Sequence, residues 1–159
     1  MAANFRGTYE NRLDKKGRVS VPAEFRQQLK GQAFEGIVAF PSLRHGSKHK
    51  ALECSGGDRL DTMSASIDPT KVLPDGTGHI TQLTLGEARD LAFDGEGRVV
   101  LPENFVAHIG ASERVTFVGQ GPFFEIWDTG AYAARKAQLF QAGLAEADRR
   151  LAKLAEGGQ

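Results

Sequence analysis

The stretch LDKKGRVSVPAEF at residues 13–25 returns as FDGEGRVVLPENF at residues 93–105, an offset of 80 residues. From the aspartate onward, six of twelve positions are identical, and they form the skeleton of a turn, a strand and a helix start. The identical pairs are Asp14 and Asp94, Gly17 and Gly97, Arg18 and Arg98, Val19 and Val99, Pro22 and Pro102, and Phe25 and Phe105. Such a pattern indicates one structural unit used twice, with surfaces that have diverged.

The first copy predicts a strand, a tight turn, a return strand and a short helix. Apolar and polar residues alternate over residues 5–13, which is typical of a strand with one covered face. Asp14 can accept hydrogen bonds from nearby backbone N–H groups, and Gly17 tolerates the left-handed conformation that a short hairpin turn requires. The return strand spans residues 18–21, and Pro22 begins a helix in which its missing N–H costs nothing.

In the second copy, Asp94, Gly97 and Arg98 are expected to build the same turn, and a second short helix is expected to begin at Pro102 and to bury Phe105 and Ile109. Each helix precedes a predicted hairpin, which pairs residues 37–40 with 51–54 in the first copy and residues 115–118 with 123–127 in the second.

Each copy is about 45 residues of β-β-α-β-β, too little to bury a stable core alone. We therefore expect an α+β protein in which the two units pack as a pseudo-dimer within one chain. The expected segments are a first unit at residues 1–57, a helix and linker at 58–84, a second unit at 85–128 and a C-terminal helix at 129–159. Within the linker, residues 58–67 are predicted as helix and residues 68–78 as a loop.

Composition restricts the setting of the protein. The chain has 159 residues, no net charge and one cysteine, Cys54, which excludes an intramolecular disulfide framework and favours a reducing compartment. No apolar run resembles a signal peptide or approaches the length of a membrane span. We expect a cytoplasmic protein.

The zero net charge hides an asymmetry between the two copies. Residues 1–30 carry seven Lys and Arg against three Asp and Glu, whereas residues 85–118 carry three against six. Lys15 and Lys16 of the first turn correspond to Gly95 and Glu96 of the second. Because the framework is kept while the cations are not, folding does not require these charges, and their clustering indicates a polyanionic partner.

The C-terminal segment carries an apolar stripe at helical spacing, with a helix expected to begin near Thr129. The stripe consists of Phe140, Leu144, Ala147, Leu151 and Leu154. It is compatible with a helix docked on its own domain or with a contact between subunits.

Signatures of catalysis are missing from the sequence, which has no Gly-rich phosphate loop, nucleophile elbow or HExxH motif. His45, His49 and Cys54 have a superficially ligand-like spacing, but a tetrahedral metal site needs a fourth group and no convincing one is present. We therefore expect no enzyme activity, no cofactor and no metal.

The residues FRGTYENRLDKKGRVSVPAEFR (5–26), DGEGRVVLPENF (94–105) and FFEIWD (123–128) resemble the MraZ family of bacterial transcriptional regulators. The resemblance implies two AbrB-like swapped-hairpin units, each with an Asp-x-x-x-Arg signature. It also implies a DNA-binding regulator, expected to be a repressor, that assembles into a ring. Such a regulator binds direct repeats upstream of its own operon, the division and cell-wall gene cluster, and is associated with the nucleoid. The long segment at residues 41–50 departs from the family pattern.

The predicted DNA contacts are cations of the first copy, which suit phosphates and guanine edges in a groove. They are Arg12, Lys15, Lys16 and Arg18, with Arg6 next. For Arg18 a second role is open, an ion pair with Asp14 that clamps the turn. In the long loop, Arg44, Lys48 and Lys50 are candidates for added phosphate contacts.

Other interpretations remain alongside DNA binding. A basic hairpin can be a solvated surface, AbrB-like units also occur in antitoxin-like interaction modules, and a ring protein can have a purely structural role.

Overall fold

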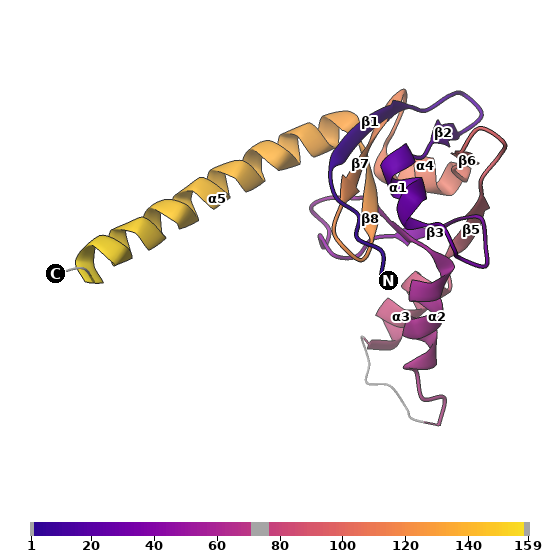
Figure 1. The fold of residues 1–159 in the computed structure, drawn as a ribbon, viewed down its shortest axis with the longest axis horizontal. Helices are drawn as coiled ribbons and strands as arrows, with labels where there is room; N and C mark the ends of the chain where they lie inside the picture. Colours follow the sequence, from indigo (N-terminus) through magenta and orange to yellow (C-terminus); the bar gives the residue numbers. More distant parts are fainter. Residues whose placement is uncertain (1, 71–76, 158–159) are drawn as a thin grey trace. The chain divides into compact units, whose positions relative to one another are not determined.

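In the computed structural model, which describes residues 2–70 and 77–157, strands of both repeat copies contribute to one sheet (Figure 1). The strands are β1 (Thr8–Arg12), β2 (Arg18–Ser20), β3 (Gly36–Pro41), β4 (Leu52–Ser55), β5 (Arg89–Ala92), β6 (Arg98–Val100), β7 (Arg114–Gly119) and β8 (Phe124–Asp128). Six of them form an antiparallel sheet in the order β1-β7-β8-β4-β3-β5, and β2 pairs with β6 in a separate two-stranded ladder. The fold is α+β, as predicted.

The outer strands of the sheet are exchanged between the copies. β1 of the first copy pairs with β7 of the second, and β5 of the second copy pairs with β3 of the first. The prediction that residues 5–13 and 18–21 pair with each other is therefore wrong beyond the turn, since β1 and β2 join different sheets. Exchange buries the apolar faces of both copies in one shared core, which a single β-β-α-β-β unit of about 45 residues cannot provide by itself.

The predicted hairpins after each helix are confirmed. β3 pairs with β4 and β7 with β8, and the two hairpins meet where β4 pairs with β8. The first predicted strand is shorter than expected and begins at Thr8. Gly7 has a φ of 98°, and Phe5 before it forms an isolated bridge with Gly121.

The helices α1 (Ala23–Gln28) and α4 (Glu103–Ile109) begin after Pro22 and Pro102, in agreement with the prediction for both copies. Each inserts a fully buried phenylalanine of the repeat, Phe25 or Phe105, into the core. The Phe25 ring lies 5.4 Å from that of Phe5 and 4.9 Å from that of Phe124, in edge and tilted contacts that add to the free energy of burial. Figure 1 shows α1, α4, β2 and β6 close together beside the sheet.

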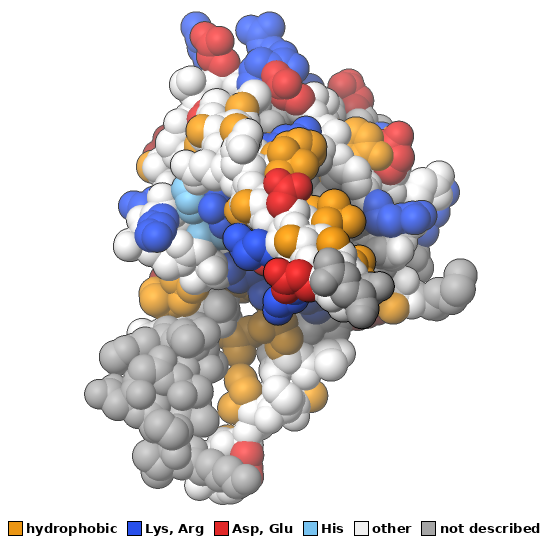
Figure 2. All heavy atoms as spheres, turned by 90° about the vertical axis from the view of Figure 1, so that its left-hand side faces the viewer, with side chains coloured by type: hydrophobic (Ala, Val, Ile, Leu, Met, Phe, Trp, Pro, Cys, Tyr) orange, Lys and Arg blue, Asp and Glu red, His pale blue; other side chains and the backbone are white. Residues whose placement is uncertain are grey.

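The predicted helix at residues 58–67 is present as α2 (Gly57–Ala65). The predicted loop at 68–78 is wrong at its end, because a further helix, α3 (Thr77–Leu85), starts there; residues 71–76 of that prediction lie outside the described residues. A hollow of the structure is bordered by Phe40, Leu43, Met63, Ile67 and Leu85. Orange apolar side chains are visible around it in the lower half of Figure 2.

The C-terminal residues form the helix α5 (Thr129–Gly157). The chain divides into one compact unit up to Thr129 and a second from Gly130 onward. The large side chains of the stripe, Phe140, Leu144, Leu151 and Leu154, are exposed. Within the described ranges no helix combines the length and apolar content that crossing a membrane requires.

Candidate nucleic-acid interface

The turn of the first copy is organised around the carboxylate of Asp14. Its Oδ1 accepts hydrogen bonds from the backbone N–H groups of Lys16 (2.9 Å) and Arg18 (2.8 Å), and its Oδ2 accepts one from Nε of Arg18 (2.6 Å). The backbone N–H of Arg18, with its guanidinium and the Lys16 N–H, lowers the pKa of Asp14 against an opposing effect of desolvation. The carboxylate is therefore ionised at neutral pH and holds Arg18 in place.

The second turn has the same geometry with other charges. Asp94 accepts bonds from the N–H groups of Glu96 (2.9 Å) and Arg98 (3.0 Å) and from Nε of Arg98 (2.8 Å). The glycines that close both turns, Gly17 and Gly97, have φ values of 81° and 76°. The shared residues of the repeat thus build the turn itself, and the residues that differ are those displayed at its tip.

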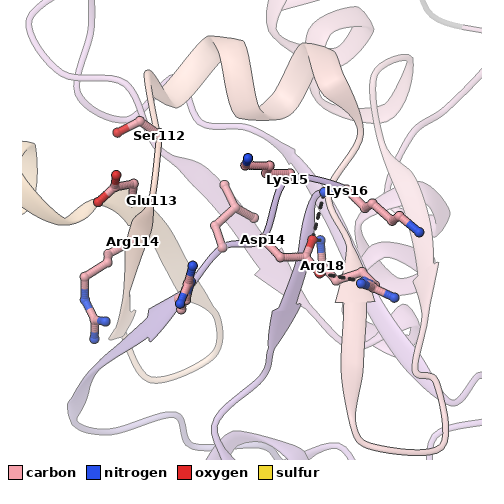
Figure 3. A pocket seen from close by; sticks show the side chains of 9 residues that line it. Asp14, Lys15, Lys16, Arg18, Ser112, Glu113 and Arg114 are labelled. Atoms are coloured by element: carbon pink, nitrogen blue, oxygen red, sulfur yellow. Dashed lines mark hydrogen bonds and ion pairs between the residues drawn. The ribbon is translucent and has the colours of Figure 1, made fainter.

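The tips of the two turns, at residues 14–18 and 94–98, are called the first and the second tip. A cleft at the first tip is lined by most of the predicted DNA contacts (Figure 3). It is lined by Arg12, Leu13, Asp14, Lys15, Lys16, Arg18, Ser112, Glu113 and Arg114. In Figure 3 the side chains of Lys15 and Lys16 leave the turn in different directions, so the two ammonium groups cover a wider surface than one would. Five cations face two carboxylates here, which gives the cleft a positive balance.

Arg114 belongs to the second copy and was not predicted. Its Cα is paired with that of Arg12 in the β1–β7 ladder, and both side chains are exposed. The guanidinium of Arg114 forms an ion pair with Glu10, which leaves half of the arginine side chain in solvent. The sequence holds no local signal for this residue, because it reaches the cleft through strand exchange.

The equivalent place at the second tip has no such pair. There the β5–β3 ladder brings Ala92 opposite Gly36. The contrast between the two tips therefore extends from the turn into the adjoining sheet.

Arg6 is the one predicted DNA contact that lies apart from the others. It is exposed, but it precedes β1, whereas the cleft lies at the strand's other end. Arg6 and Arg12 are six positions apart in the chain, which corresponds to at most about 20 Å. The expected patch therefore comprises Arg12, Lys15, Lys16 and Arg18, joined by Arg114.

The long loop after β3 is held by two buried carboxylates on neighbouring strands. Glu53 and Glu125 are opposite each other in the β4–β8 ladder and are 3% and 1% exposed. Glu53 binds Arg44 at 2.6 Å and Arg59 at 2.8 Å, and both guanidinium groups lie over the ring of Phe123. The Glu53 carboxylate raises the pKa of Arg44. The arginine proposed for phosphate contacts from this loop thus has a structural ion pair.

One of the two histidines considered for a metal site, His45, is bound by the second buried carboxylate. His45 Nε2 lies 2.8 Å from Glu125 Oε2, and its ring is 5.0 Å from that of Trp127. Burial raises the pKa of the Cys54 thiol well above its usual value, which keeps it protonated. Among the residues that the structure describes, no three metal-ligating side chains converge.

On the face seen in Figure 2, Lys and Arg side chains are interspersed with Asp and Glu. A cationic cleft at one tip is therefore a local feature of a protein with no net charge.

The sequence of this chain matches a known protein family and several of its members. Residues 4–40 and 84–155 match the family model described as "MraZ protein, putative antitoxin-like". The chain is 42% identical over 131 residues to the transcriptional regulator MraZ of Parvibaculum lavamentivorans, covering 82% of this chain and 80% of the relative. It is 38% identical over 146 residues to that of Pelagibacter ubique, covering 88% and 92%, and 45% identical over 117 residues to that of Rickettsia bellii, covering 74% and 75%. These relatives are named as regulators of transcription, which is a non-enzymatic class.

Proposed function

This chain belongs to the MraZ family, and from that premise we propose that it is a sequence-specific DNA-binding regulator that uses the cleft at its first tip. The regulatory class follows from the family. The further proposal is a repressor that binds direct repeats upstream of its own operon, in the division and cell-wall gene cluster. It would act as a ring-shaped homo-oligomer in the cytoplasm, associated with the nucleoid.

The observation that carries this proposal is the group of cations at one tip of a repeated scaffold. Arg12, Lys15, Lys16 and Arg18 line one cleft with Arg114, whereas the second tip has Ala92, Gly95 and Glu96 at the corresponding places. The second copy does without counterparts of Arg12, Lys15 and Lys16, so the fold does not need these cations, and their position around one concave surface suits the phosphates of a duplex.

The major groove admits a two-stranded ribbon, and Arg18 of the cleft lies on the two-stranded ladder of β2 and β6. Lys15 and Lys16 would contact phosphates as point charges, while Arg18 has a planar guanidinium suited to a guanine edge. Only Nε of Arg18 is engaged by Asp14, so the carboxylate orients the guanidinium and leaves its terminal amino groups for a base. Arg6, at the far end of β1, would contribute at most a flanking phosphate contact.

One tip offers few contacts, so affinity would come from several subunits bound to consecutive repeats. Linkage raises the effective concentration of each later contact. The exposed apolar stripe of α5 is suited to a contact between subunits of such an assembly.

The test is an electrophoretic mobility shift assay with the protein's own upstream DNA at several salt concentrations. The variant K15E/K16E is compared with K30E/R89E, which makes the same change of charge at exposed positions outside the cleft. The salt slope is the slope of the logarithm of the binding constant against the logarithm of the salt concentration. We expect the first variant to bind DNA weakly and with a salt slope smaller in magnitude by about 2, and the second variant to keep most of the wild-type slope. Equal binding by wild type and K15E/K16E would refute the site assignment.

The alternative function, an antitoxin-like interaction module, expects an extended C-terminal arm that wraps a toxin. α5 is helical over 29 residues and gives no support to such an arm. A mobility shift that depends on DNA sequence would favour the regulator over both this alternative and a purely structural ring.

A further inference from the structure

The ladder of β2 and β6 presents an outward face beside the cationic cleft. Val19 and Val99 point into the core and are 0% and 1% exposed. Because successive side chains of a strand point to opposite faces, the residues before and after each of these valines point outward. The outward pairs are Arg18 with Val100 and Ser20 with Arg98. Each pair therefore joins an arginine of one copy to a smaller side chain of the other.

Val100 is unusual in this position, because its side chain is 54% exposed. Within the two repeated segments, residues 13–25 and 93–105, all of which the structure describes, it is the one large apolar side chain in solvent. The corresponding residue of the first copy is Ser20. An apolar side chain therefore occupies the end of the ladder that adjoins Lys15 and Lys16, and a hydroxyl occupies the other end.

The backbone fixes Val100 next to the first tip. The N–H of Leu101, the following residue, donates a hydrogen bond of 2.8 Å to the carbonyl oxygen of Gly17. A Cβ on Gly17 would lie 2.7 Å from the Leu101 oxygen, so the turn and the end of β6 are in direct contact. Valine is also stiff at χ1, which means that little side-chain entropy is lost when a ligand covers it.

The charges around Val100 indicate which ligand covers it. Its cross-strand neighbour is Arg18, held by Asp14 in the orientation described above. The opposite end of the ladder, by contrast, adjoins Asp94 and Glu96, which bind Arg98 at 2.8 Å and 3.7 Å. An anionic ligand would therefore approach the end that displays Arg18 and Val100 together.

We propose that Val100 contacts the C5-methyl group of a thymine in the major groove, beside the base that Arg18 contacts. This inference rests on the proposed DNA-binding function and adds a specificity-determining residue to it. Thymine is the one base with a methyl group at its major-groove edge, and an apolar side chain recognises it by excluding water from both surfaces. Cross-strand side chains lie about 5 Å apart, which places Val100 within reach of a base next to that read by Arg18.

The test uses the upstream DNA amplified with dUTP in place of dTTP, which removes every thymine methyl group and keeps Watson–Crick pairing. Wild-type protein is expected to bind the uracil DNA about fourfold to tenfold more weakly than the thymine DNA. The variant V100S, which copies the residue of the first repeat, is expected to bind both DNAs with nearly equal affinity. V100I, which keeps an apolar side chain, should retain the preference for thymine.

Each outcome is decisive. The inference is overturned if wild type binds both DNAs equally, or if V100S shows the same ratio as wild type, because shape changes in uracil DNA affect all variants alike. Binding of wild type to neither DNA would instead refute the proposed function, and this inference with it. Because Val100 is exposed, V100S should unfold at the wild-type temperature, which thermal denaturation checks.

Discussion

The two turns of this protein share one architecture and differ in what they display. In both, an aspartate accepts two backbone hydrogen bonds and one from the guanidinium four residues later. The first turn is surrounded by four cations, Lys15, Lys16 and the cross-strand pair Arg12 and Arg114. The second turn has no counterpart of these four. The comparison separates residues that build the turn from residues that are free to bind a partner.

Exchanging the tips tests this comparison most strongly. The variant K15G/K16E, which gives the first tip the residues of the second, should lower DNA affinity by about 100-fold at moderate salt, because two phosphate contacts are lost and a repulsive charge is added. Fluorescence anisotropy with the upstream DNA measures the loss. The reverse variant, G95K/E96K, should gain little, because Ala92 and Gly36 stand where the first tip has Arg12 and Arg114. A loss below threefold in K15G/K16E would contradict the division of roles.

The glycines of the two turns should differ in how much they contribute to stability. Both have a positive φ, which an alanine adopts only with strain. At Gly17 the added Cβ would also meet the backbone oxygen of Leu101, whereas at Gly97 it would meet the side chain of Arg26, which can move. We expect G17A to lower the free energy of unfolding by about 2 kcal/mol and G97A by about 1 kcal/mol. Urea denaturation measures both, and an equal loss would show that the backbone contact at Gly17 relaxes easily.

Removing Arg114 tests whether the second copy contributes to the first tip. R114A should weaken DNA binding by about fivefold and reduce the salt slope by about 1, through loss of one phosphate contact. Its ion pair with Glu10 is half-exposed, so the stability of the fold should change little. R89A, which removes another exposed arginine of the second copy, is the matched control. Equal affinities of R114A and R89A would remove Arg114 from the interface.

The smallest expected effect concerns pH. Backbone N–H groups lower the pKa of both Asp14 and Asp94 in the folded state below the ordinary value of 3.8. Because the folded-state pKa is the lower one, this stabilisation is complete above the ordinary pKa and is lost as the pH falls through the folded value. Thermal denaturation between pH 6 and pH 2 should therefore show a shallower acid-side decrease in D14N/D94N than in wild type. Parallel profiles would indicate that the turns open before the carboxylates titrate.

Much of the fold could be predicted from local patterns. The repeat, the Asp and Gly of each turn, the helix starts at Pro22 and Pro102 and both later hairpins depend on neighbouring residues, whose preferences the sequence expresses directly. The exchange of strands could not be worked out from these patterns. Apolar alternation shows that a strand has a covered face and says nothing about which strand lies beside it.

The grouping of the candidate residues was predictable to the same extent, although their role in DNA binding stays a prediction. Four cations near one turn are visible in the sequence, and the structure brings Arg12, Lys15, Lys16 and Arg18 to one cleft. Arg114 lies about a hundred residues away in the chain and becomes a neighbour only through the β1–β7 ladder. The pairing of His45 with Glu125, 80 residues apart, is invisible for the same reason.

Strand exchange also has a consequence for synthesis on the ribosome. β1 is made among the first residues, but its partner β7 begins at Arg114. A nascent chain must therefore carry an unpaired edge strand until more than two thirds of the protein has been translated, and local hairpins such as β3–β4 can form long before it. Since Arg114 arrives with β7, an interrupted translation product would lack both the partner of β1 and the last cation of the cleft.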